Sequence, residues 1–480
     1  MRVAKAYLGR HKATSAFFHP RHNVFHWCAT ITTSASDFDH HHPRIARLNH
    51  GSFGACPRPV LDAQDSFRRE WLANPDGLYF TGRLHDGIAQ AAAAAATALV
   101  PPQAAESAHD FGTIGGIDPN TQVALVENAT VAAVAIARRW AKRIRRGDVI
   151  VYLSYAYKAC VHVLREHCER EGAHLVELDV PWLCATEDEI CDAIDEQLAA
   201  LTSSGDPSHP GQRQLRYAFL DHVSSQPAVL LPIKRLVALC RAHGAEEVCV
   251  DGAHSVGSVS DLDVVDIDAD FFFTNFHKWG FAPSTVSALY ARDAALMRTT
   301  SHPITSWDWK KGIVREAQFP GTRDISAMIA LPAAVEYLRA WRSNIAGGGD
   351  HGSSGISDGE MMNSAEYCHA RVREAAAQLR FVWGTEDEDP AARMYSGLVA
   401  TQEMVMLPRD LVVDDNPGMP GGGLRSLLRD EFKVEAAIGN FGEEKGSYVR
   451  LSFAVYNSAR DVKRLRDAVM EILDDQKMRL

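Results

Sequence analysis

The sequence contains no hydrophobic run long enough to cross a membrane, because a spanning helix needs about 20 mostly apolar residues and no stretch approaches that length. Its nine cysteines are scattered, without the paired spacing of a zinc site. An odd, unpatterned set in a long chain predicts reduced thiols rather than a disulfide framework. A basic excess is also absent, since the net charge is −11. We therefore expect a soluble protein with no membrane or nucleic-acid partner, acting on a small substrate.

No acidic residue precedes Asp37, whereas the first 36 positions hold Arg2, Lys5, Arg10, Lys12 and Arg21. This bias is typical of an organelle presequence. The segment is also rich in histidine and aromatic residues, however, which presequences do not specially favour. Residues 1–36 are thus either a presequence for a mitochondrion or plastid or an N-terminal extension of a cytoplasmic protein.

The overall composition is that of an ordinary globular enzyme, with 46% hydrophobic and 23% charged residues. Because 480 residues exceed a single average core, we expect two lobes. A Gly- and Ser-rich interruption at residues 344–359 is typical of a flexible insertion or a linker between lobes.

Two short apolar runs, EVCVD and ADFFFTN, organise the middle of the chain, and each ends abruptly in polar side chains. The first run ends at Asp251, and the second at Asn275, shortly before Lys278. Buried parallel strands deliver polar groups to their carboxyl edge in this way. We therefore expect a carboxylate and a lysine close together at one edge of a parallel sheet.

A carboxylate and an amine in this arrangement are what pyridoxal 5'-phosphate (PLP) requires of a protein: one group faces the ring nitrogen and the other bonds to the aldehyde carbon. Taken singly, Lys278 would be a surface lysine and Asp251 a helix cap. Their joint occurrence favours a PLP site over that structural interpretation.

The two strand ends resemble the cofactor segment of the PLP-dependent class V aminotransferase family, which includes cysteine desulfurases and isopenicillin N epimerases. The family's D-x-A-[HQ] and S/N-x-H-K-[WY] elements are matched by the stretches that begin at Asp251 and Asn275, and Lys278 follows Asp251 by 27 residues. The resemblance implies that Lys278 bonds the cofactor and then acts as general base, while Asp251 keeps the ring nitrogen protonated. It also implies that His254 donates to the ring oxygen and that Asn275 and His277 help to bind the phosphate.

The fold implied by the resemblance is α/β, the PLP-dependent transferase fold type I. Its large domain carries a seven-stranded, mostly parallel sheet, and a small α/β domain follows at the C-terminus. The expected boundaries are residues 37–82 for a segment that packs on the small domain and the site mouth, 83–334 for the large domain and 335–480 for the small one.

Further cofactor contacts follow from the same resemblance. A strand, a short polar turn and a helix N-terminus favour an anion at Asn128, Ala129 and Thr130, and the family's N-A-T turn holds the cofactor phosphate. Tyr157 aligns with an aromatic residue that stacks on the ring, although Lys158 replaces the family's glycine. The remaining candidates are Ser225, near the ring hydroxyl, and Thr322 in GTRD, which would reach the phosphate of the neighbouring subunit in a homodimer.

Two stretches are candidates for the amino-acid substrate. Residues 48–57, LNHGSFGACP, resemble a signature at the site mouth, which implies that Asn49, Gly51 and Ser52 line the substrate pocket. Arg450 lies mid-strand in VRLSF, where a buried arginine needs a partner and its planar fork suits a carboxylate. The resemblance of RLSFAVYN to R-[IL]-S-x-x-x-Y-N implies that Arg450 binds the substrate carboxylate.

The reaction is constrained by a missing cysteine. Cysteine desulfurases carry a mobile catalytic cysteine shortly before the carboxylate arginine, but no cysteine lies between Cys368 and Arg450. The combined signatures are most similar to the plant-type L-cysteine desulfhydrase branch, so we expect a carbon–sulfur lyase that forms sulfide, pyruvate and ammonia from L-cysteine. The alternatives are an epimerase similar to isopenicillin N epimerase, an aminotransferase of unknown substrate, and a non-enzymatic scaffold with an unreactive Lys278.

Overall fold

The computed structural model describes residues 33–106, 112–184, 186–203, 214–343, 361–414 and 423–479. Within these ranges, no helix is both long enough and apolar enough to cross a membrane. The candidate presequence is almost entirely outside the described residues, as is the Gly- and Ser-rich interruption at 344–359. Both interpretations therefore stay predictions.

The large lobe is built on a seven-stranded sheet with the order β2-β8-β7-β6-β5-β3-β4. Strands β3 to β7 are mutually parallel, whereas β8 runs antiparallel to both of its neighbours. The sequence-based prediction of a seven-stranded, mostly parallel sheet is thus confirmed. The strands are β2 (Val123–Val126), β3 (Val149–Leu153), β4 (His174–Leu178), β5 (Leu215–Asp221), β6 (Glu247–Asp251), β7 (Phe271–Asn275) and β8 (Ser287–Ala291).

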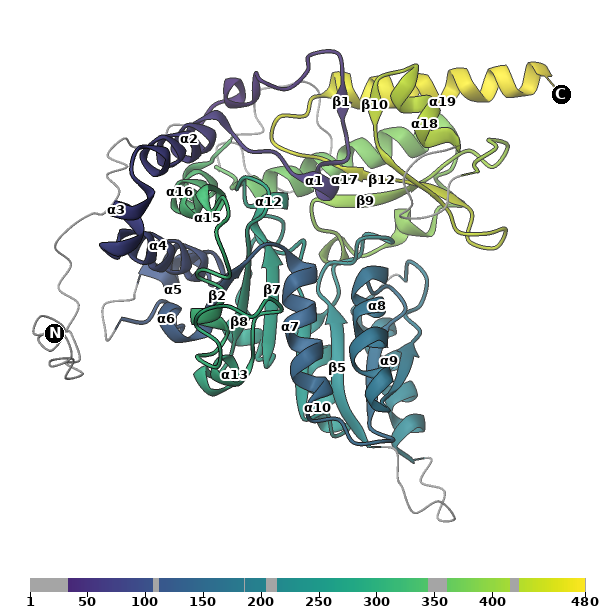
Figure 1. Ribbon diagram of the computed structural model, residues 1–480. Helices are drawn as coiled ribbons and strands as arrows, with labels where there is room; N and C mark the ends of the chain where they lie inside the picture. Colours follow the sequence, from purple (N-terminus) through teal and green to yellow (C-terminus); the bar gives the residue numbers. More distant parts are fainter. Residues whose placement is uncertain are drawn as a thin grey trace, which may run out of the picture.

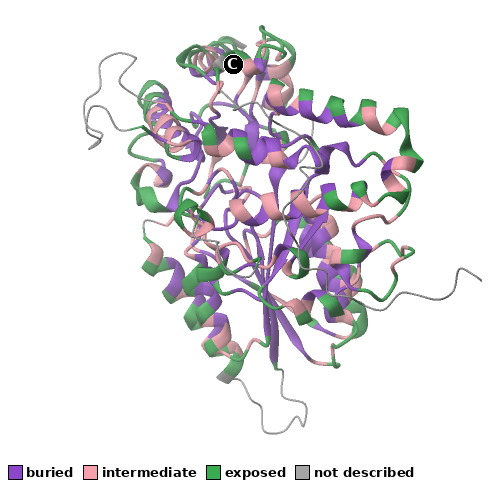
Figure 2. Ribbon diagram, turned by 90° about the vertical axis from the view of Figure 1, so that its left-hand side faces the viewer, coloured by how far each residue is buried: buried purple, intermediate pink, exposed green. Residues whose placement is uncertain are grey.

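Helices cover both faces of this sheet, because its central strands are apolar on both sides. One face packs on α4 (Arg83–Ala98), α9 (Glu187–Ser203), α10 (Ile233–Ala242) and α16 (Leu331–Ala340). The other packs on α7 (Ala129–Ala141), α8 (Lys158–His167), α13 (Ala294–Thr299) and α14 (Ile313–Glu316). Figure 2 shows the buried sheet between helices whose outer sides are exposed.

A smaller lobe follows the large sheet in the chain. Its three-stranded antiparallel sheet has the order β11-β12-β9, from β9 (Gln402–Met406), β11 (Ala437–Asn440) and β12 (Ser447–Ser452). It lies with α17 (Ser364–Trp383), α18 (Gly423–Asp430) and α19 (Ala459–Arg479) beyond the upper end of the large sheet in Figure 1. The N-terminal strand β1 (Ala46–Arg47) pairs with β10 (Val434–Glu435), so the start of the described chain joins this lobe.

Short elements complete the fold. The remaining α-helices are α1 (His50–Phe53), α2 (Arg58–Ala73), α3 (Pro75–Phe80), α5 (Pro102–Glu106), α6 (Pro119–Gln122), α11 (Val264–Ile267), α12 (Phe276–Trp279) and α15 (Ser326–Ile329). The 3-10 turns are Ala35–Phe38, Glu169–Glu171, Pro390–Arg393 and Ser396–Leu398. Residues 50–53 form the single turn α1, which contacts α12 between the two lobes (Figure 1). The domain boundaries at residues 37–82, 83–334 and 335–480 stay predictions.

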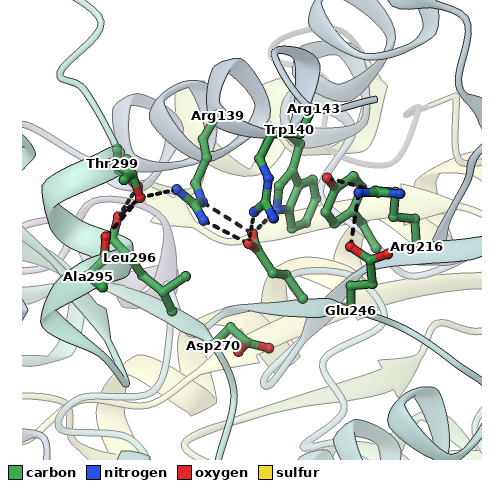
Figure 3. A network of polar contacts seen from close by, with 12 residues as sticks. Arg139, Trp140, Arg143, Arg216, Glu246, Asp270, Ala295, Leu296 and Thr299 are labelled. Atoms are coloured by element: carbon green, nitrogen blue, oxygen red, sulfur yellow. Dashed lines mark hydrogen bonds and ion pairs between the residues drawn. The ribbon is translucent and has the colours of Figure 1, made fainter. Parts of the chain in front are cut away.

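A buried ion network lies at the amino end of β6. Glu247 accepts hydrogen bonds from Arg139 Nη2 (2.8 Å) and from Trp140 Nε1 (2.9 Å), and it also pairs with Arg143. Figure 3 shows Arg139 bridging onward to Thr299 of α13. These contacts tie α7 and α13 to the sheet at the edge opposite to the one where Asp251 lies.

Candidate active site

Lys278 lies at the carboxyl edge of the large sheet, on the single turn α12 that continues directly from β7. Gly54 fixes this turn against the N-terminal segment, because a Cβ there would stand 1.7 Å from the His277 carbonyl oxygen. Burial lowers the pKa of the Lys278 amine to about 8, although the nearby charge of Asp251 opposes the shift. A substantial fraction of the amine is therefore neutral near physiological pH, as a nucleophile or base requires.

His254 contacts this amine, with Nε2 3.0 Å from Lys278 Nζ. The other ring nitrogen, Nδ1, accepts from the indole N–H of Trp279 at 3.4 Å. An indole N–H is only a donor, so Nδ1 has no proton and Nε2 carries it. Burial, together with the charges of Lys278 and Arg450, holds the pKa of His254 well below its usual value. His254 thus presents one N–H donor to the neutral amine.

Asp251 ends β6 one strand away and is 4% exposed. Its Oδ1 accepts the Ala253 N–H at 2.9 Å, and its Oδ2 lies 3.5 Å from the Cys160 thiol. Burial raises the pKa of Asp251, while the Ala253 N–H and the charge of Lys278 act in the opposite direction. The carboxylate therefore has few donors and is suited to a cationic partner.

Arg450 projects from β12 of the small lobe and is 2% exposed. Its Nη2 donates to Asn49 Oδ1 (2.7 Å) and Ser52 Oγ (2.9 Å), and its Nη1 donates to the carbonyl and hydroxyl oxygens of Ser225 (3.0 Å each). All of these acceptors are neutral, and in the described ranges no carboxylate forms an ion pair with Arg450. Burial lowers its pKa to about 10, with the charge of Arg425 adding to the effect. A buried cation with only neutral partners is suited to act as a receptor for an anion.

Gly51 has no side chain to contact a ligand, but its small size allows the backbone to pack closely against Gln402. A Cβ on Gly51 would lie 2.5 Å from Gln402 Oε1, so only glycine fits without displacement. Asn49 and Ser52 are the residues of this segment that reach Arg450, and Ser52 Oγ also donates to Asn49 Oδ1 at 2.9 Å. Their contact with a substrate stays a prediction.

The turn at the start of α7 has one free donor position for an anion. Asn128 Oδ1 accepts the Val131 N–H as a helix cap (3.0 Å), and Asn275 Oδ1 accepts the Ala129 N–H (2.9 Å). In the described structure, neither the N–H nor the hydroxyl of Thr130 has an acceptor. Asn275 therefore holds the turn in place through its side-chain oxygen. Of Asn128, Ala129 and Thr130, it is Thr130 whose donors are free to bind an anion.

His277 contacts the residue just before β8, and no hydrogen bond in the described structure joins it to the α7 turn. Its Nδ1–H donates to the Val286 carbonyl at 3.3 Å, and burial with the Lys278 charge lowers its pKa to about 4. The neutral ring therefore has an unprotonated Nε2, which can accept a hydrogen bond. The role assigned to this residue stays a prediction.

Three other predicted residues have distinct locations. Tyr157 is 52% exposed at the N-terminus of α8 and lies near enough to Arg450 to affect its pKa. Ser225 uses its hydroxyl to hold Arg450, and its predicted place near the ring hydroxyl stays untested. Thr322 is exposed, and no contact in the described part of the chain joins it to Lys278. Its neighbour Arg323 pairs with Glu127, which precedes Asn128.

Three further residues of this edge were not predicted from the sequence: Cys160, His50 and Gln402. Cys160 lies one turn after Tyr157 on α8, a helical spacing that offered a signal. His50 stands between the selected residues Asn49 and Gly51, and its ring lies 4.5 Å from the ring of Trp279, with Nδ1 3.0 Å from the Tyr456 hydroxyl. Gln402 donates to the Ser224 carbonyl at 3.1 Å, a contact between lobes that the sequence does not announce.

The donor set fits PLP. Lys278 supplies a partly neutral amine, Asp251 a buried carboxylate, His254 an N–H donor and Thr130 the open N–H of a helix N-terminus. All of them lie at the carboxyl edge of a mostly parallel α/β sheet, where such sheets bind their ligands.

Comparison with known proteins places the chain in a family. Residues 57–351 match the aminotransferase class-V family. The chain belongs to this family. Class-V relatives with curated names include a "Putative L-cysteine desulfhydrase 1" of Oryza sativa subsp. japonica, 34% identical over 92% of this chain and 86% of the relative. An "L-cysteine desulfhydrase" of Arabidopsis thaliana is 30% identical over 92% of this chain and 90% of its own length.

More distant class-V relatives share the fold. An isopenicillin N epimerase of Amycolatopsis lactamdurans is 24% identical over 90% of this chain and 96% of its own. The solved structure of the cysteine desulfurase CsdA from Escherichia coli superposes with a TM-score of 0.62 at 18% identity, covering 92% of this chain and 99% of CsdA. A C-DES variant with glycine covalently linked to its PLP cofactor gives 0.61 at 16% identity, covering 92% of this chain and all of that one. The predicted fold type I is thereby confirmed, and the family's enzymes and solved neighbours are PLP-dependent.

Proposed function

We propose that this class-V protein is a PLP-dependent carbon–sulfur lyase that converts L-cysteine and water to hydrogen sulfide, pyruvate and ammonia. The observation that carries the proposal is the buried Arg450, held by Asn49, Ser52 and Ser225 and lacking a carboxylate partner in the described chain. The charge of Arg450 acts on the pKa of Lys278, so the two groups are near each other, and an amino acid bound through its carboxylate would present its Cα toward the amine. The names of the curated relatives give the same substrate.

We assign the cofactor contacts to the residues that were predicted from the sequence. Lys278 would hold PLP covalently, Asp251 would face the ring nitrogen and His254 would donate to the ring oxygen. Tyr157 would stack on the ring, while Asn128, Ala129, Thr130, Asn275 and His277 would form or support the phosphate site. When bound, PLP withdraws electron density from the substrate Cα and so makes its proton acidic.

The protein's own groups then move the protons. Lys278 Nζ, neutral once it is free of the cofactor, takes the proton from Cα. Hydrosulfide (HS⁻) would then leave from Cβ, and the proton taken by Nζ would pass to it to give hydrogen sulfide. Arg450 holds the carboxylate throughout, which keeps the Cα–H bond in reach of Nζ. Hydrolysis of the remaining three-carbon unit adds one water and gives pyruvate and ammonia.

The cysteines of the chain support elimination over persulfide transfer. All eight described cysteines have a pKa raised by burial, including Cys160 and Cys368, so none is activated as a thiolate. The segment between Cys368 and Arg450 contains none at all. A lyase needs no such thiolate, because sulfide leaves directly.

The reaction is tested by product stoichiometry. We expect the PLP-loaded protein to form sulfide and pyruvate in equal amounts from L-cysteine, with far less from D-cysteine. The Lys278→Ala variant, reconstituted with PLP, is the matched control and should form neither product. Sulfide with alanine would instead indicate a desulfurase, and inversion of an amino acid without sulfide would indicate an epimerase; either result contradicts the proposal.

We also propose a homodimer in which Thr322 reaches the cofactor phosphate of the partner subunit. The exposed Thr322 supports this arrangement, because it lines a groove with the apolar residues Phe67, Trp71 and Leu72, the last of which is 80% exposed. Light scattering should give twice the mass of the chain, and Leu72→Glu should shift the protein toward the monomer and weaken PLP binding. A wild-type monomer with full activity would contradict the dimer.

A further inference from the structure

A second buried carboxylate stands beside Asp251. Asp221 is the last residue of β5 and Asp251 the last of β6, and the parallel register pairs them directly. Paired residues on neighbouring parallel strands lie about 5 Å apart and point to the same face of the sheet. Asp221 is 3% exposed and Asp251 is 4% exposed. Two acidic side chains are thus buried together against α8.

The two carboxyls have different partners. Both oxygens of Asp251 have donors, the Ala253 N–H and the Cys160 thiol. The backbone N–H of Tyr157 stabilises the charged form of Asp221, but Asp221 Oδ2 is buried without a partner in the described structure. An ionised oxygen in that position would be costly, whereas a protonated one carries its own donor.

Among the described residues, no cation offsets the charge of Asp221. The titratable groups that face it are Asp251 and Cys249 of β6 and Cys160 of α8, with Tyr157 at the start of that helix. The charge of Lys278 opposes the rise in the pKa of Asp251, whereas only the Tyr157 N–H opposes the rise in the pKa of Asp221. Burial and then the charge of Asp251 raise the pKa of Asp221 well above its usual value. Two like charges so close in a buried site do not both persist, and one carboxyl keeps a proton.

We propose that Asp221 is a positioning residue that remains a neutral acid, so that the single negative charge of the pair resides on Asp251. The neutral carboxyl also anchors the Tyr157 backbone, and so connects the two residues assigned to the ring nitrogen and the ring face. The positioning role of Asp221 rests on the proposed PLP site. The protonation of Asp221 is independent of that site, because it is a property of the protein without cofactor.

The protonation state is tested first on the cofactor-free protein by infrared spectroscopy. At neutral pH, the wild type minus Asp221→Asn difference spectrum should contain the C=O stretching band of a protonated carboxyl. Glu247→Gln, which removes an ionised buried carboxylate of the next strand, should leave that band in place. In Asp251→Asn the band should disappear at lower pH than in the wild type, because a like charge has been removed. A difference spectrum with only ionised-carboxylate bands would overturn the proposal.

The loaded enzyme tests the positioning role. Asn is a neutral isostere with a donor, so Asp221→Asn should keep kcat within about threefold, and the midpoint pH of the cofactor's visible band should move by less than about 0.3 units. Asp221→Leu, which lacks both the donor and the Tyr157 anchor, should lower kcat by at least about tenfold at unchanged cofactor content. A large midpoint shift in Asp221→Asn would mean that Asp221 is charged, and full activity of Asp221→Leu would mean that it positions nothing. Failure to bind PLP at all would refute the proposed function while leaving the infrared result valid.

Discussion

Glu247 and Asp251 are the two ends of strand β6, and both are buried on the face of the sheet that α7 and α8 cover. Burial by itself raises the pKa of Glu247, but the hydrogen bonds and charge of Arg139, together with Trp140 and Arg143, lower it below its usual value. Burial also raises the pKa of Asp251, and there the Ala253 N–H and Lys278 only partly oppose it. Only three residues of one strand separate a fully paired acid from a poorly paired one.

This contrast distinguishes a structural charge from a functional one. A buried carboxylate that serves the fold has its partners supplied by the protein, as Glu247 has. Asp251 has a thiol and one backbone N–H, and Arg450 across the lobe boundary has neutral acceptors only. Charges that the fold leaves unbalanced are available to a ligand, so we expect the carboxyl edge to bind a ligand and the amino edge to stabilise the fold.

Replacing each acid of β6 by its amide should give the largest difference in effect between the two ends of the strand. Asp251→Asn should bind PLP but lose activity by about 10²- to 10³-fold, because a neutral amide does not hold the ring nitrogen protonated. Glu247→Gln should keep kcat but lose about 3–5 kcal/mol of unfolding free energy, because Arg139 stays buried without its partner. Kinetics and denaturant unfolding of both variants measure this. Equal losses of kcat in the two variants would contradict the assignment of Asp251 to function and Glu247 to stability.

Removing the other unbalanced charge tests the substrate side of the carboxyl edge. Arg450→Gln should raise the KM for L-cysteine about 10- to 100-fold, since a hydrogen bond to a charged group contributes about 1.5–3 kcal/mol. The visible band of the bound cofactor should not change in intensity. Arg450→Lys, which keeps a charge without the planar fork, should fall between the two. An unchanged KM in Arg450→Gln would exclude it as the carboxylate receptor.

Much of this edge was predictable from the sequence because its signals are local. EVCVD and ADFFFTN are β6 and β7 to the residue or nearly so, and the polar groups after them meet as expected. The arginine in β12 was also identified from its strand. The hydrogen-bond partner of each group could not be predicted from the sequence, because the residues bound to Arg450 lie about 225 and 400 positions away. The contacts of Cys160 and Gln402 are long-range in the same way.

The pH dependence of the rate of PLP binding reports the lowered pKa of Lys278. The pKa of Lys278 is about 8 in the folded protein and 10.5 for an ordinary lysine. Since the neutral amine is the reactive form, the rate at which apoprotein captures PLP should rise about tenfold per pH unit and level off above about pH 8. Arg450→Gln should move the midpoint upward, because the Arg450 charge lowers this pKa. Stopped-flow absorbance measures the rates, and Nα-acetyl-lysine, whose rate should keep rising beyond pH 8, is the control.

The same shift has a consequence for stability. The unfolded chain keeps the Lys278 proton up to about pH 10.5, so unfolding takes up a proton between about pH 8 and that value. The contribution of Lys278 to apoprotein stability should therefore rise with pH across this window. A Lys278→Met variant should lack that rise; if it showed the same slope as the wild type, the amine would not be the group that titrates.

The smallest effect is expected at the outer member of the amino-edge network. The Arg143 side chain is 43% exposed, and Arg139 and Trp140 remain on Glu247 when it is removed. Arg143→Ala should cost only about 0.5–1 kcal/mol of unfolding free energy and leave kcat and KM unchanged. Denaturant midpoints check the first expectation and steady-state kinetics the second. A kinetic change would show that the two ends of β6 are coupled.

The central claim is that the unbalanced edge at Lys278 is a PLP site, and covalent labelling tests it most directly. The PLP-loaded protein is reduced with borohydride, digested and analysed by mass spectrometry, with Asp251→Asn treated in parallel as a variant that keeps the lysine. We predict one phosphopyridoxyl group per chain, on Lys278 in both proteins. A label on any other lysine, or none on a protein that contains PLP, would contradict the assignment.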